Sequence, residues 1–410
     1  MNSSSTGLEW TEWLQGWRRL TYETLFQKIH AKHLQDPLLL PPLNGLNCIV
    51  TGATSGIGLE IAKQLAESGA HLVMAVRNTS FAHQLIQKWR RNETESRPLS
   101  IDVIELDLFH LESVVKFAQE WNSRSKPLHI LINNAGIYSI GQPQKFTKDG
   151  YETHIQVNHL APALLSVLLL PSLKRGTPSR IINMNSLMHV IGVVDPQDMN
   201  FLTKKNKFTS RKAYSSSKLA QLKFSSILQK FLINTNIHVL CVEPGAVRTN
   251  VTRDLPRILN ILYQKMFFFM FDAQQGSRSA LFAATDADIL DYCGDLKAQE
   301  CNVCAFIGCH CRISEPSKEA YNERTSFEIW NKTMEMVGLP AGGVDMILQG
   351  EEIHCRYGAN WPIQKGFRKL RQIKSSYSPV PPAGSKKLAA IRRRLIIKLI
   401  SNETQNSNLP

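Results

Sequence analysis

The sequence lacks a long hydrophobic run and is poor in cysteine. Its longest apolar stretches, such as Pro162–Pro171, fall short of the ~20 residues that a membrane-spanning helix needs. Met1–Gly7 is polar, without the basic and apolar segments of a secretory signal peptide. Eight cysteines in 410 residues are too few for a disulfide scaffold. These absences predict a cytoplasmic protein of a reducing compartment, with a peripheral position on a membrane as the alternative, and they do not indicate an organelle.

The composition is that of a folded protein, and its positive charge is confined to one end. The chain is 43% hydrophobic and 20% charged, which excludes a collagen-like or wholly disordered protein. The net charge is +14, but residues 359–410 hold eleven Lys and Arg against the single acid Glu403. The basicity therefore describes a tail, and we predict no nucleic-acid binding by the folded part.

The sequence divides into three segments. Residues 44–340 alternate short β-branched runs with amphipathic stretches such as Leu59–Glu67 and Leu111–Trp121. This alternation predicts an α/β fold, a doubly wound parallel sheet with helices on both faces. Residues 1–43 form a Trp-rich helical extension, and residues 341–410 form a linker and a basic, partly disordered tail. The runs expected to form strands are Asn47–Val50, Leu72–Val76, Ile101–Leu106, His129–Asn133, Arg180–Met184 and Ile237–Val242.

The two terminal segments each permit more than one interpretation. Apolar residues from Trp10 to Ile29 recur every three or four positions, which predicts an amphipathic helix before the breaks at Pro37 and Pro41. This helix either lies in a membrane interface, where Trp is favoured, or packs on the main domain or a partner. Lys387–Ile400 predicts a basic amphipathic helix on an anionic membrane, or a solvated tail.

A glycine-rich turn, TGATSGIG at 51–58, follows the first strand directly and opens a helix. Glycines let the chain turn sharply and approach a pyrophosphate closely. The helix N-terminus offers free N–H groups and a positive dipole to the anion. The turn therefore predicts a dinucleotide site. Its expected cofactor contacts are Gly52, Thr54, Ser55, Gly56, Ile57 and Gly58.

The ends of the second and third strands indicate which dinucleotide binds. After Val76 come Arg77 and Asn78, where a site for NAD usually has a carboxylate for the ribose 2′-hydroxyl. An Arg instead fits a 2′-phosphate through charge-assisted hydrogen bonds, so we predict NADP(H). Alternatively, Arg77 is a solvated surface residue. Asp107 and Leu108 follow the third strand, where the Asp can accept from the adenine amino group.

A catalytic group is expected from residues after the fourth and fifth strands and on a later helix. Tyr214 and Lys218 are four residues apart and share one face of a helix. A nearby ammonium favours the phenolate, so the spacing predicts that Lys218 lowers the pKa of Tyr214 for general acid–base work. Ser186 is placed to polarise a substrate carbonyl, and Asn158 to hold a water that links Lys218 to solvent.

These motifs give the chain a family resemblance. Across residues 44–340 it resembles the short-chain dehydrogenase/reductases: TGATSGIG, NNAG at 133–136, the residues just named, and PGAVRT at 244–249 stand in that family's order. AVRN at 75–78 and RIINMNSLMH at 180–189 look like its retinol-dehydrogenase and WW-domain-oxidoreductase branch, and the N-terminal helix looks like plant oxidoreductases of the FOREVER YOUNG type. The resemblance implies a Rossmann sheet of about seven strands.

The resemblance also implies roles for particular residues. Asn158, Ser186, Tyr214 and Lys218 would form the catalytic tetrad. Tyr214 would protonate a carbonyl oxygen or deprotonate an alcohol, and Lys218 would also contact the nicotinamide ribose. Further cofactor contacts are implied at the NNAG and PGAVRT motifs, the latter against the nicotinamide carboxamide. They are Asn134, Ala135, Gly136, Pro244, Gly245, Val247 and Thr249.

Two further features bear on substrate and metal. The Phe-rich stretch Ile258–Phe271 is expected to cover the substrate, and its apolar character favours a lipid, isoprenoid or steroid-like carbonyl. Burial as core or dimer surface, and contact with a membrane, remain alternatives. The cysteines from Cys301 to Cys311 do not follow a standard zinc spacing, so no metal site is predicted. A zinc site and reactive thiols are the alternatives to incidental cysteines here.

The sequence thus predicts an NADP(H)-dependent oxidoreductase that acts on a hydrophobic carbonyl or alcohol. A homodimer and a membrane surface are the expected partners besides the substrate. The alternative is a regulatory or interaction protein that binds the cofactor but turns over little substrate.

Overall fold

A computed structural model of the chain describes residues 10–91, 98–203, 207–248, 268–351 and 353–358. Its strands are β1 Asn47–Thr51, β2 His71–Val76, β3 Ile101–Glu105, β4 Ile130–Asn133, β5 Ser179–Met184, β6 Ile237–Val242 and β7 Ala305–Ile307. Its α-helices are α1 Trp10–His30, α2 Gly56–Glu67, α3 Thr79–Arg91, α4 Leu111–Ser123, α5 Thr153–Ile155, α6 Ala161–Leu168, α7 Leu170–Arg175, α8 Ser210–Phe231, α10 Ala273–Thr285, α11 Asp288–Ala298, α12 Glu323–Met336 and α13 Gly343–Gln349. A π-helical turn η1, Gln156–Leu160, and two 3-10 turns, η2 Leu187–Ile191 and η5 Lys318–Tyr321, join them.

The strands form one seven-stranded sheet in the order β3-β2-β1-β4-β5-β6-β7, and every pairing is parallel. The chain therefore crosses from one half of the sheet to the other between β3 and β4. This is the doubly wound α/β fold that the strand–helix alternation predicts, and the prediction is confirmed. Ligands of such sheets bind beyond the carboxyl ends of the strands, near this crossover.

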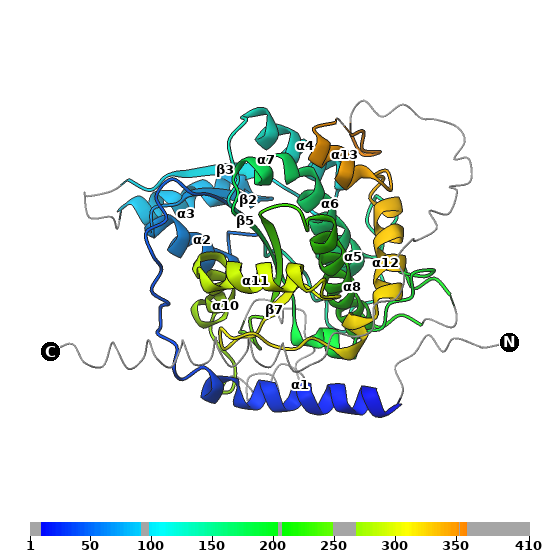
Figure 1. The fold of residues 1–410 in the computed structure, drawn as a ribbon. Coiled ribbons are helices and arrows are strands. Elements are labelled where there is room, and N and C mark those ends of the chain that lie inside the picture. The colour runs from blue at the N-terminus through cyan, green and yellow to red at the C-terminus, as the bar shows by residue number, and fades with distance from the viewer. Residues whose placement is uncertain (1–9, 92–97, 204–206, 249–267, 352, 359–410) are drawn as a thin grey trace. The chain divides into compact units, whose positions relative to one another are not determined.

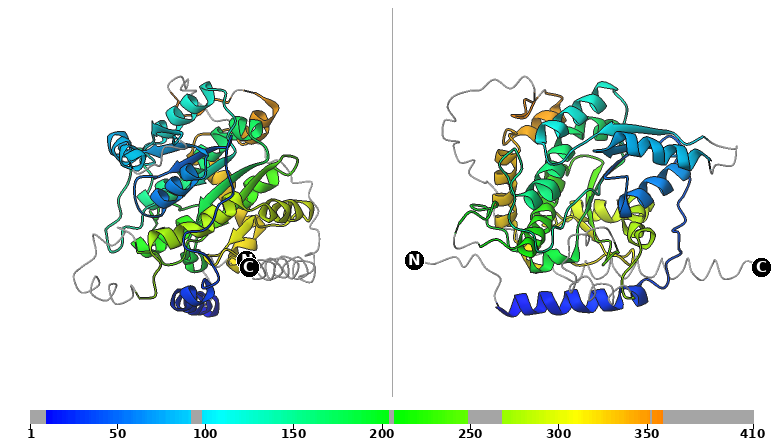
Figure 2. Two further views of the ribbon diagram at one scale, coloured as in Figure 1. Left: turned by 90° about the vertical axis from the view of Figure 1, so that its left-hand side faces the viewer. Right: turned by 180° about the vertical axis from the view of Figure 1, so that it is seen from behind.

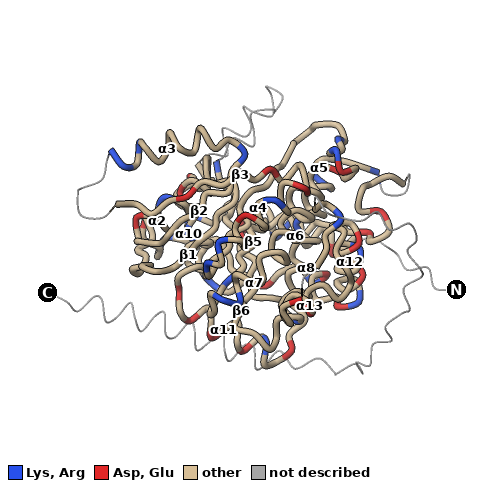
Figure 3. The backbone as a smooth tube through the Cα atoms, turned by 90° about the horizontal axis from the view of Figure 1, so that it is seen from above, with Lys and Arg blue, Asp and Glu red and all other residues tan. Residues whose placement is uncertain are grey.

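Helices cover both faces of the sheet. α2, α10 and α11 pack on one face, and α4, α6 and α8 pack on the other, where α12 packs against α8 (Figures 1 and 2). Strand residues such as Ile49, Val73 and Ile181 are fully buried between these layers. Lys, Arg, Asp and Glu are interspersed along the described chain (Figure 3), as expected if the excess charge belongs to the tail.

The described part of the last segment, residues 341–351 and 353–358, packs into the same core as the sheet and its helices. Val344 and Ile347 of α13, together with Cys355, are buried in the core beside α7. Residues 341–358 therefore contribute apolar surface to the folded unit. The predicted boundaries at 43 and 340 stay a prediction. The expected linker Ser375–Ser385 and basic helix Lys387–Ile400 lie outside the described residues.

The predicted N-terminal helix is present as α1, which lies across the carboxyl ends of the strands (Figure 1). Its inner side packs closely, because a Cβ at Gly16 would lie 2.9 Å from the Val190 carbonyl oxygen of η2. Its outer side is also apolar, with large side chains in contact with solvent. These are Trp10, Leu14, Tyr22, Leu25, Phe26 and Ile29. Within the described ranges, no helix has the length and apolar character that a bilayer crossing requires.

Candidate active site

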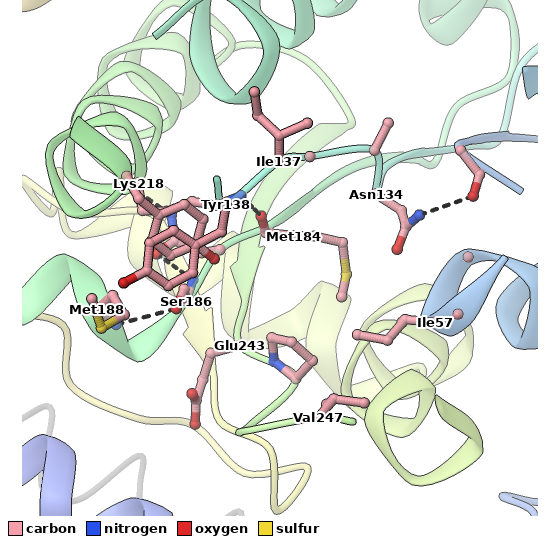
Figure 4. A pocket seen from close by; sticks show the side chains of 18 of the residues that line it. Ile57, Asn134, Ile137, Tyr138, Met184, Ser186, Met188, Lys218, Glu243 and Val247 are labelled. Atoms are coloured by element: carbon pink, nitrogen blue, oxygen red, sulfur yellow. Dashed lines mark hydrogen bonds between the residues drawn. The ribbon is translucent and has the colours of Figure 1, made fainter. Parts of the chain in front are cut away.

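A cavity of about 950 Å³ lies beyond the carboxyl ends of the strands. Its wall comes from the segments that follow β1 to β6 and from the inner side of α1. Most predicted cofactor and catalytic residues line it, and Figure 4 shows Asn134, Ser186, Lys218 and Val247 around one space. The parallel sheet thus gathers residues that are far apart in the sequence.

The glycine-rich turn has no room for larger residues. Gly52 adopts a φ of +66°, and a Cβ at Gly58 would lie 2.4 Å from the Gly52 carbonyl oxygen. The Ser55 side chain does not cap α2, which leaves N–H groups of the first helical turn available to a ligand. An anion can therefore sit against the backbone here, at the positive end of the α2 dipole.

The predicted adenosine side is formed by the ends of β2 and β3. Arg77 is exposed at the cavity wall, with its guanidinium carbon 5.7 Å from the centre of the Phe109 ring. The Asn78 side chain accepts from the Phe81 backbone N–H at the start of α3. Asp107 also lines the cavity, but its carboxylate is occupied within its own turn, where it accepts from the Phe109 N–H and contacts His110. Leu108 also contributes to the wall.

The NNAG motif connects the glycine-rich turn to the catalytic side. Asn134 Nδ2 donates to the Thr51 carbonyl oxygen at 2.9 Å, and the Ala135 N–H donates to the Thr51 hydroxyl. At Gly136 a Cβ would lie 3.1 Å from Asn158 Oδ1, so only a small residue fits. The motif therefore fixes the spacing between β1 and β4 at the centre of the site.

Asn158 lies in the π-helical turn η1, a geometry that often marks functional positions. Its side chain holds Ile137 by two hydrogen bonds and donates to the Ser217 hydroxyl of α8 at 3.0 Å. Its carbonyl oxygen accepts from Gln221. Asn158 therefore braces the segment after β4 against α8. The predicted water link to Lys218 stays a prediction.

Ser186, Tyr214 and Lys218 meet at the cavity wall as the sequence predicts. Tyr214 and Lys218 lie on the first turns of α8, with the Lys218 Nζ 5.8 Å from the centre of the Tyr214 ring. The Ser186 hydroxyl hydrogen-bonds the Tyr214 phenol and accepts from the Met188 N–H. Lys218 donates to the Met184 carbonyl oxygen at 2.7 Å. A phenol and a hydroxyl thus face the same point of the cavity.

The prediction that the pKa of Tyr214 is lowered is wrong for this structure. Burial raises the pKa of Tyr214 to about 12, and the Ser186 hydrogen bond acts in the opposite direction without outweighing it. Burial likewise lowers the pKa of Lys218 to about 8. At neutral pH the phenol therefore carries its proton.

The PGAVRT loop and α1 are joined by a residue that sequence reasoning missed. The Gln27 side chain is 1% exposed, accepts from the Ala246 N–H and donates to the Ala246 and Phe269 carbonyl oxygens. Gly245 has a φ of +79°, and a Cβ there would lie 2.6 Å from Gln27 Oε1. Pro244, Gly245 and Val247 line the cavity, whereas Thr249 lies outside the described residues. Gln27 thus makes α1 part of the site.

Tyr138 is a second residue that the motifs did not single out. Its ring stacks on Tyr214 with centroids 4.3 Å apart and planes 17° apart. Burial raises the pKa of Tyr138, so it too is neutral at pH 7. An aromatic two residues beyond NNAG was the available signal in the sequence. The stack limits the rotation of the Tyr214 ring.

Two buried histidines next to predicted catalytic residues make the fold sensitive to acid. Burial lowers the pKa of His159 to about 3 and that of His189 to about 4, whereas an unfolded His titrates near ~6.5. Below ~6.5 the unfolded chain takes up protons that the native state cannot bind. The two histidines therefore do not reduce the stability of the native state above that pH. On acidification below it, the free energy of unfolding falls by about 1.4 kcal/mol per pH unit for each His.

Urea unfolding between pH 7.5 and 5 measures this slope. His159→Gln keeps a hydrogen-bonding group for Thr333, which His159 contacts at 2.8 Å. The variant is expected to reduce the change in the free energy of unfolding with pH by about 1.4 kcal/mol per pH unit. An unchanged slope in this variant would show that His159 titrates normally in the native state.

Comparison with known proteins identifies the family. Residues 47–196 and 201–258 match the family model for short chain dehydrogenases. The chain belongs to that family. It is 55% identical to the dehydrogenase/reductase SDR family member FEY of Arabidopsis thaliana, over 86% of this chain and 94% of that protein. It is 34% identical to retinol dehydrogenase 12 of Mus musculus, over 71% of this chain and 86% of the relative.

A solved structure supports the fold as well. The crystal structure of an uncharacterised protein from Mycobacterium paratuberculosis matches with a TM-score of 0.56 and 29% identity, over 72% of this chain and 95% of that chain. The protein is therefore a short-chain dehydrogenase/reductase, an oxidoreductase of a family that uses NAD(P). The resemblance inferred from the motifs is confirmed.

The residues of the cavity fit a nicotinamide dinucleotide. Gly52 and Gly58 leave the backbone of the turn open, and the uncapped start of α2 provides donors for a pyrophosphate. Arg77, Asp107, Tyr214 and Lys218 line the same cavity, the first two on its predicted adenosine side and the last two on its predicted nicotinamide side. When bound, the cofactor supplies or accepts the hydride.

The expected lid and the cysteine cluster are only partly described. Residues 258–267 of the lid lie outside the described residues, while Phe271 is buried against Ala31 and Cys309 and Phe268 is exposed. Across the described ranges, His, Cys, Asp and Glu form no group of three or more that is placed to hold a metal ion.

Proposed function

We propose that the protein is an NADP(H)-dependent oxidoreductase that transfers a hydride between nicotinamide and a hydrophobic carbonyl or alcohol. The observation that carries this proposal is that Tyr214, Ser186 and Lys218 line the same cavity as the glycine-rich turn. A substrate oxygen between the Tyr214 phenol and the Ser186 hydroxyl would accept a hydrogen bond from each. Tyr214 would then give its proton to that oxygen as the carbonyl is reduced.

The protonation states favour the reducing direction. A phenol with a pKa of about 12 holds its proton at neutral pH and is ready to act as the acid. Lys218, with a pKa of about 8, remains mostly cationic at pH 7 and stabilises negative charge that develops on the phenolate. Asn158 and Tyr138 would hold the two sides of the catalytic group in place, through the hydrogen bonds and the ring stack described above.

Arg77 supports NADP(H) over NAD(H). No carboxylate pairs with its guanidinium among the described residues, so its donors are free for a 2′-phosphate. We expect Arg77→Ala to weaken NADPH binding by about tenfold, the low end for a charged hydrogen bond because Arg77 is exposed. The affinity for NADH should hardly change.

Equilibrium titrations monitored by NADPH and NADH fluorescence test this preference. Arg90→Ala is the matched control, because it removes an Arg of α3 that does not line the cavity. Equal loss of affinity for both dinucleotides in Arg77→Ala would contradict recognition of a 2′-phosphate.

The cavity wall supports an apolar substrate of the lipid, isoprenoid or retinoid-like kind. Its α1 side includes Trp17 and Leu20, and Leu187 and Met188 of η2 lie beside Ser186. A retinol dehydrogenase is also among the chain's relatives. Burial of an apolar chain against these side chains would contribute roughly 25 cal/mol per Å² of surface removed from water.

The outer face of α1 supports contact with a membrane surface. Trp10 is 70% exposed and Ile29 is 56% exposed, and the basic side chains of Arg18 and Lys32 are exposed on the same segment. Exposed aromatic and aliphatic groups beside Lys and Arg are typical of helices that lie in the interface of anionic membranes. We propose a peripheral protein whose substrate approaches from the lipid side of α1.

The decisive test is NADPH oxidation by the full chain against long-chain aldehydes, ketones and retinoid-like carbonyls presented in anionic vesicles. Turnover of some of these carbonyls, and none with short water-soluble ones, is the expected result. Tight NADPH binding without turnover of any carbonyl would favour the alternative, a cofactor-binding regulatory protein.

A further inference from the structure

Glu243 is a buried acid that lines the cavity, and the proposed reaction gives it no role. It follows β6 directly, is 6% exposed and lines the cavity. Figure 4 shows its side chain extending from the end of β6 into the region below Ser186. A carboxyl group in a largely apolar chamber is costly unless it has a partner.

Contacts within the protein satisfy only part of the hydrogen-bonding capacity of the Glu243 carboxyl group. Glu243 Oε1 accepts from the Cys309 backbone N–H at 3.2 Å, and the Cys309 thiol also hydrogen-bonds the carboxylate. Within the described ranges no Lys, Arg or His forms an ion pair with it. Arg19 is close enough to act through its charge, but its guanidinium donates to the carbonyl oxygens of Glu315 and Pro316. The carboxylate therefore retains capacity to accept hydrogen bonds from a ligand.

The neighbouring wall holds a second acid and several apolar side chains. Glu23 of α1 lines the same cavity and raises the pKa of Glu243 through its charge, a smaller effect than that of burial. Two nearby carboxyl groups disfavour ionisation of both, and a carboxyl group in either protonation state keeps an oxygen that accepts from an O–H or N–H donor. The same chamber is lined by Trp17, Leu20 and Leu187, which favour an apolar ligand body.

We propose that Glu243 determines substrate specificity by accepting a hydrogen bond from a hydroxyl group that the hydrophobic substrate carries in addition to its reacting carbonyl. The inference rests on the proposed function and narrows its substrate class. The substrate class is an apolar hydroxycarbonyl compound, or the corresponding diol in the oxidising direction. A site with a buried acceptor discriminates strongly against an analogue that lacks the donor, because the acceptor is then left unpaired.

The test compares pairs of carbonyl substrates that differ only in the hydroxyl group. Full-length protein is assayed for kcat/KM with a series of ω-hydroxyaldehydes of increasing chain length and with the unsubstituted aldehydes of equal length. We expect a preference for the hydroxylated member of about tenfold or more at the length that reaches Glu243. Glu243→Leu should abolish or reverse the preference, mainly through KM, because an unsubstituted aldehyde then no longer leaves a buried acceptor unpaired.

Two further variants separate specificity from folding. Glu243→Gln keeps the shape and an acceptor oxygen, so it should retain part of the preference. Glu67→Gln, at the end of α2 and outside the cavity, should leave it unchanged. ω-Aminoaldehydes distinguish a cationic partner from a hydroxyl, and a preference for the amine would overturn the proposal.

A binding measurement without turnover completes the test. An unreactive diol should bind the protein–NADPH complex about tenfold or more tightly than the alcohol that lacks its second hydroxyl, and Glu243→Leu should remove the difference. Equal affinity and equal kcat/KM throughout would overturn the role of Glu243 and leave the oxidoreductase intact. NADPH binding without reduction of any aldehyde would instead contradict the proposed function itself.

Discussion

Replacing Tyr214 by Phe is expected to lower kcat for carbonyl reduction by about 10²–10⁴-fold, the contribution of a positioned general acid. The Phe ring fills the same space and can keep the stack on Tyr138, whose centroid lies 4.3 Å away. The fold and NADPH affinity should therefore persist. Steady-state kinetics and a fluorescence titration with NADPH measure the two quantities separately.

Tyr138→Phe is the matched control for this result. It removes a phenol hydroxyl from the other ring of the stack and leaves the Ser186–Tyr214 hydrogen bond in place. Its effect on kcat should be far smaller. Retention of wild-type kcat by Tyr214→Phe would show that the proton comes from another group.

Gly58→Ala is expected to reduce kcat/KM for NADPH by about a hundredfold. The added Cβ would lie 2.3 Å from Asn134 Nδ2 and 2.4 Å from the Gly52 carbonyl oxygen, and the backbone there cannot move without opening the turn. A shift of about 1 Å in a binding element is enough for a loss of this size. Overpacking should also destabilise the fold by about 1–3 kcal/mol.

Gly294→Ala controls for the substitution itself. Gly294 lies in α11, does not line the cavity, and has no neighbouring atom within 4 Å of the position that a Cβ would take. Ala is a better helix residue, so this variant should be more stable by about 0.5–1 kcal/mol and unchanged in NADPH kinetics. Wild-type NADPH affinity in Gly58→Ala would contradict the assignment of the turn as the pyrophosphate site.

Much of the fold could be predicted because it depends on local patterns. Strand boundaries read from β-branched runs differ from those of the structure by only a residue or so, as for Asn47–Val50 against β1 Asn47–Thr51. The carboxyl ends of parallel strands meet at one edge, so motifs that follow strands had to come together. Arg77 and Ser186 line one cavity for this reason, whereas Tyr214 reaches the same cavity from α8.

The rest depends on tertiary packing that no local pattern records. Gln27 contacts the Ala246 backbone across 219 residues, and nothing in a Trp-rich helix marks that Gln as buried. Glu243 looks like an ordinary residue before Pro244 until α1 encloses it. The pKa of Tyr214 follows from the depth of burial, which the spacing to Lys218 does not reveal.

Hydride transfer itself is the most direct test of the account. Full-length protein would be incubated with NADPH deuterated at the transferable C4 position and long-chain hydroxylated aldehydes in anionic vesicles, and the alcohols analysed by mass spectrometry. The account predicts one deuterium at the former carbonyl carbon with wild-type protein and almost none with Tyr214→Phe. Bound NADPH with no deuterium in any product would contradict it.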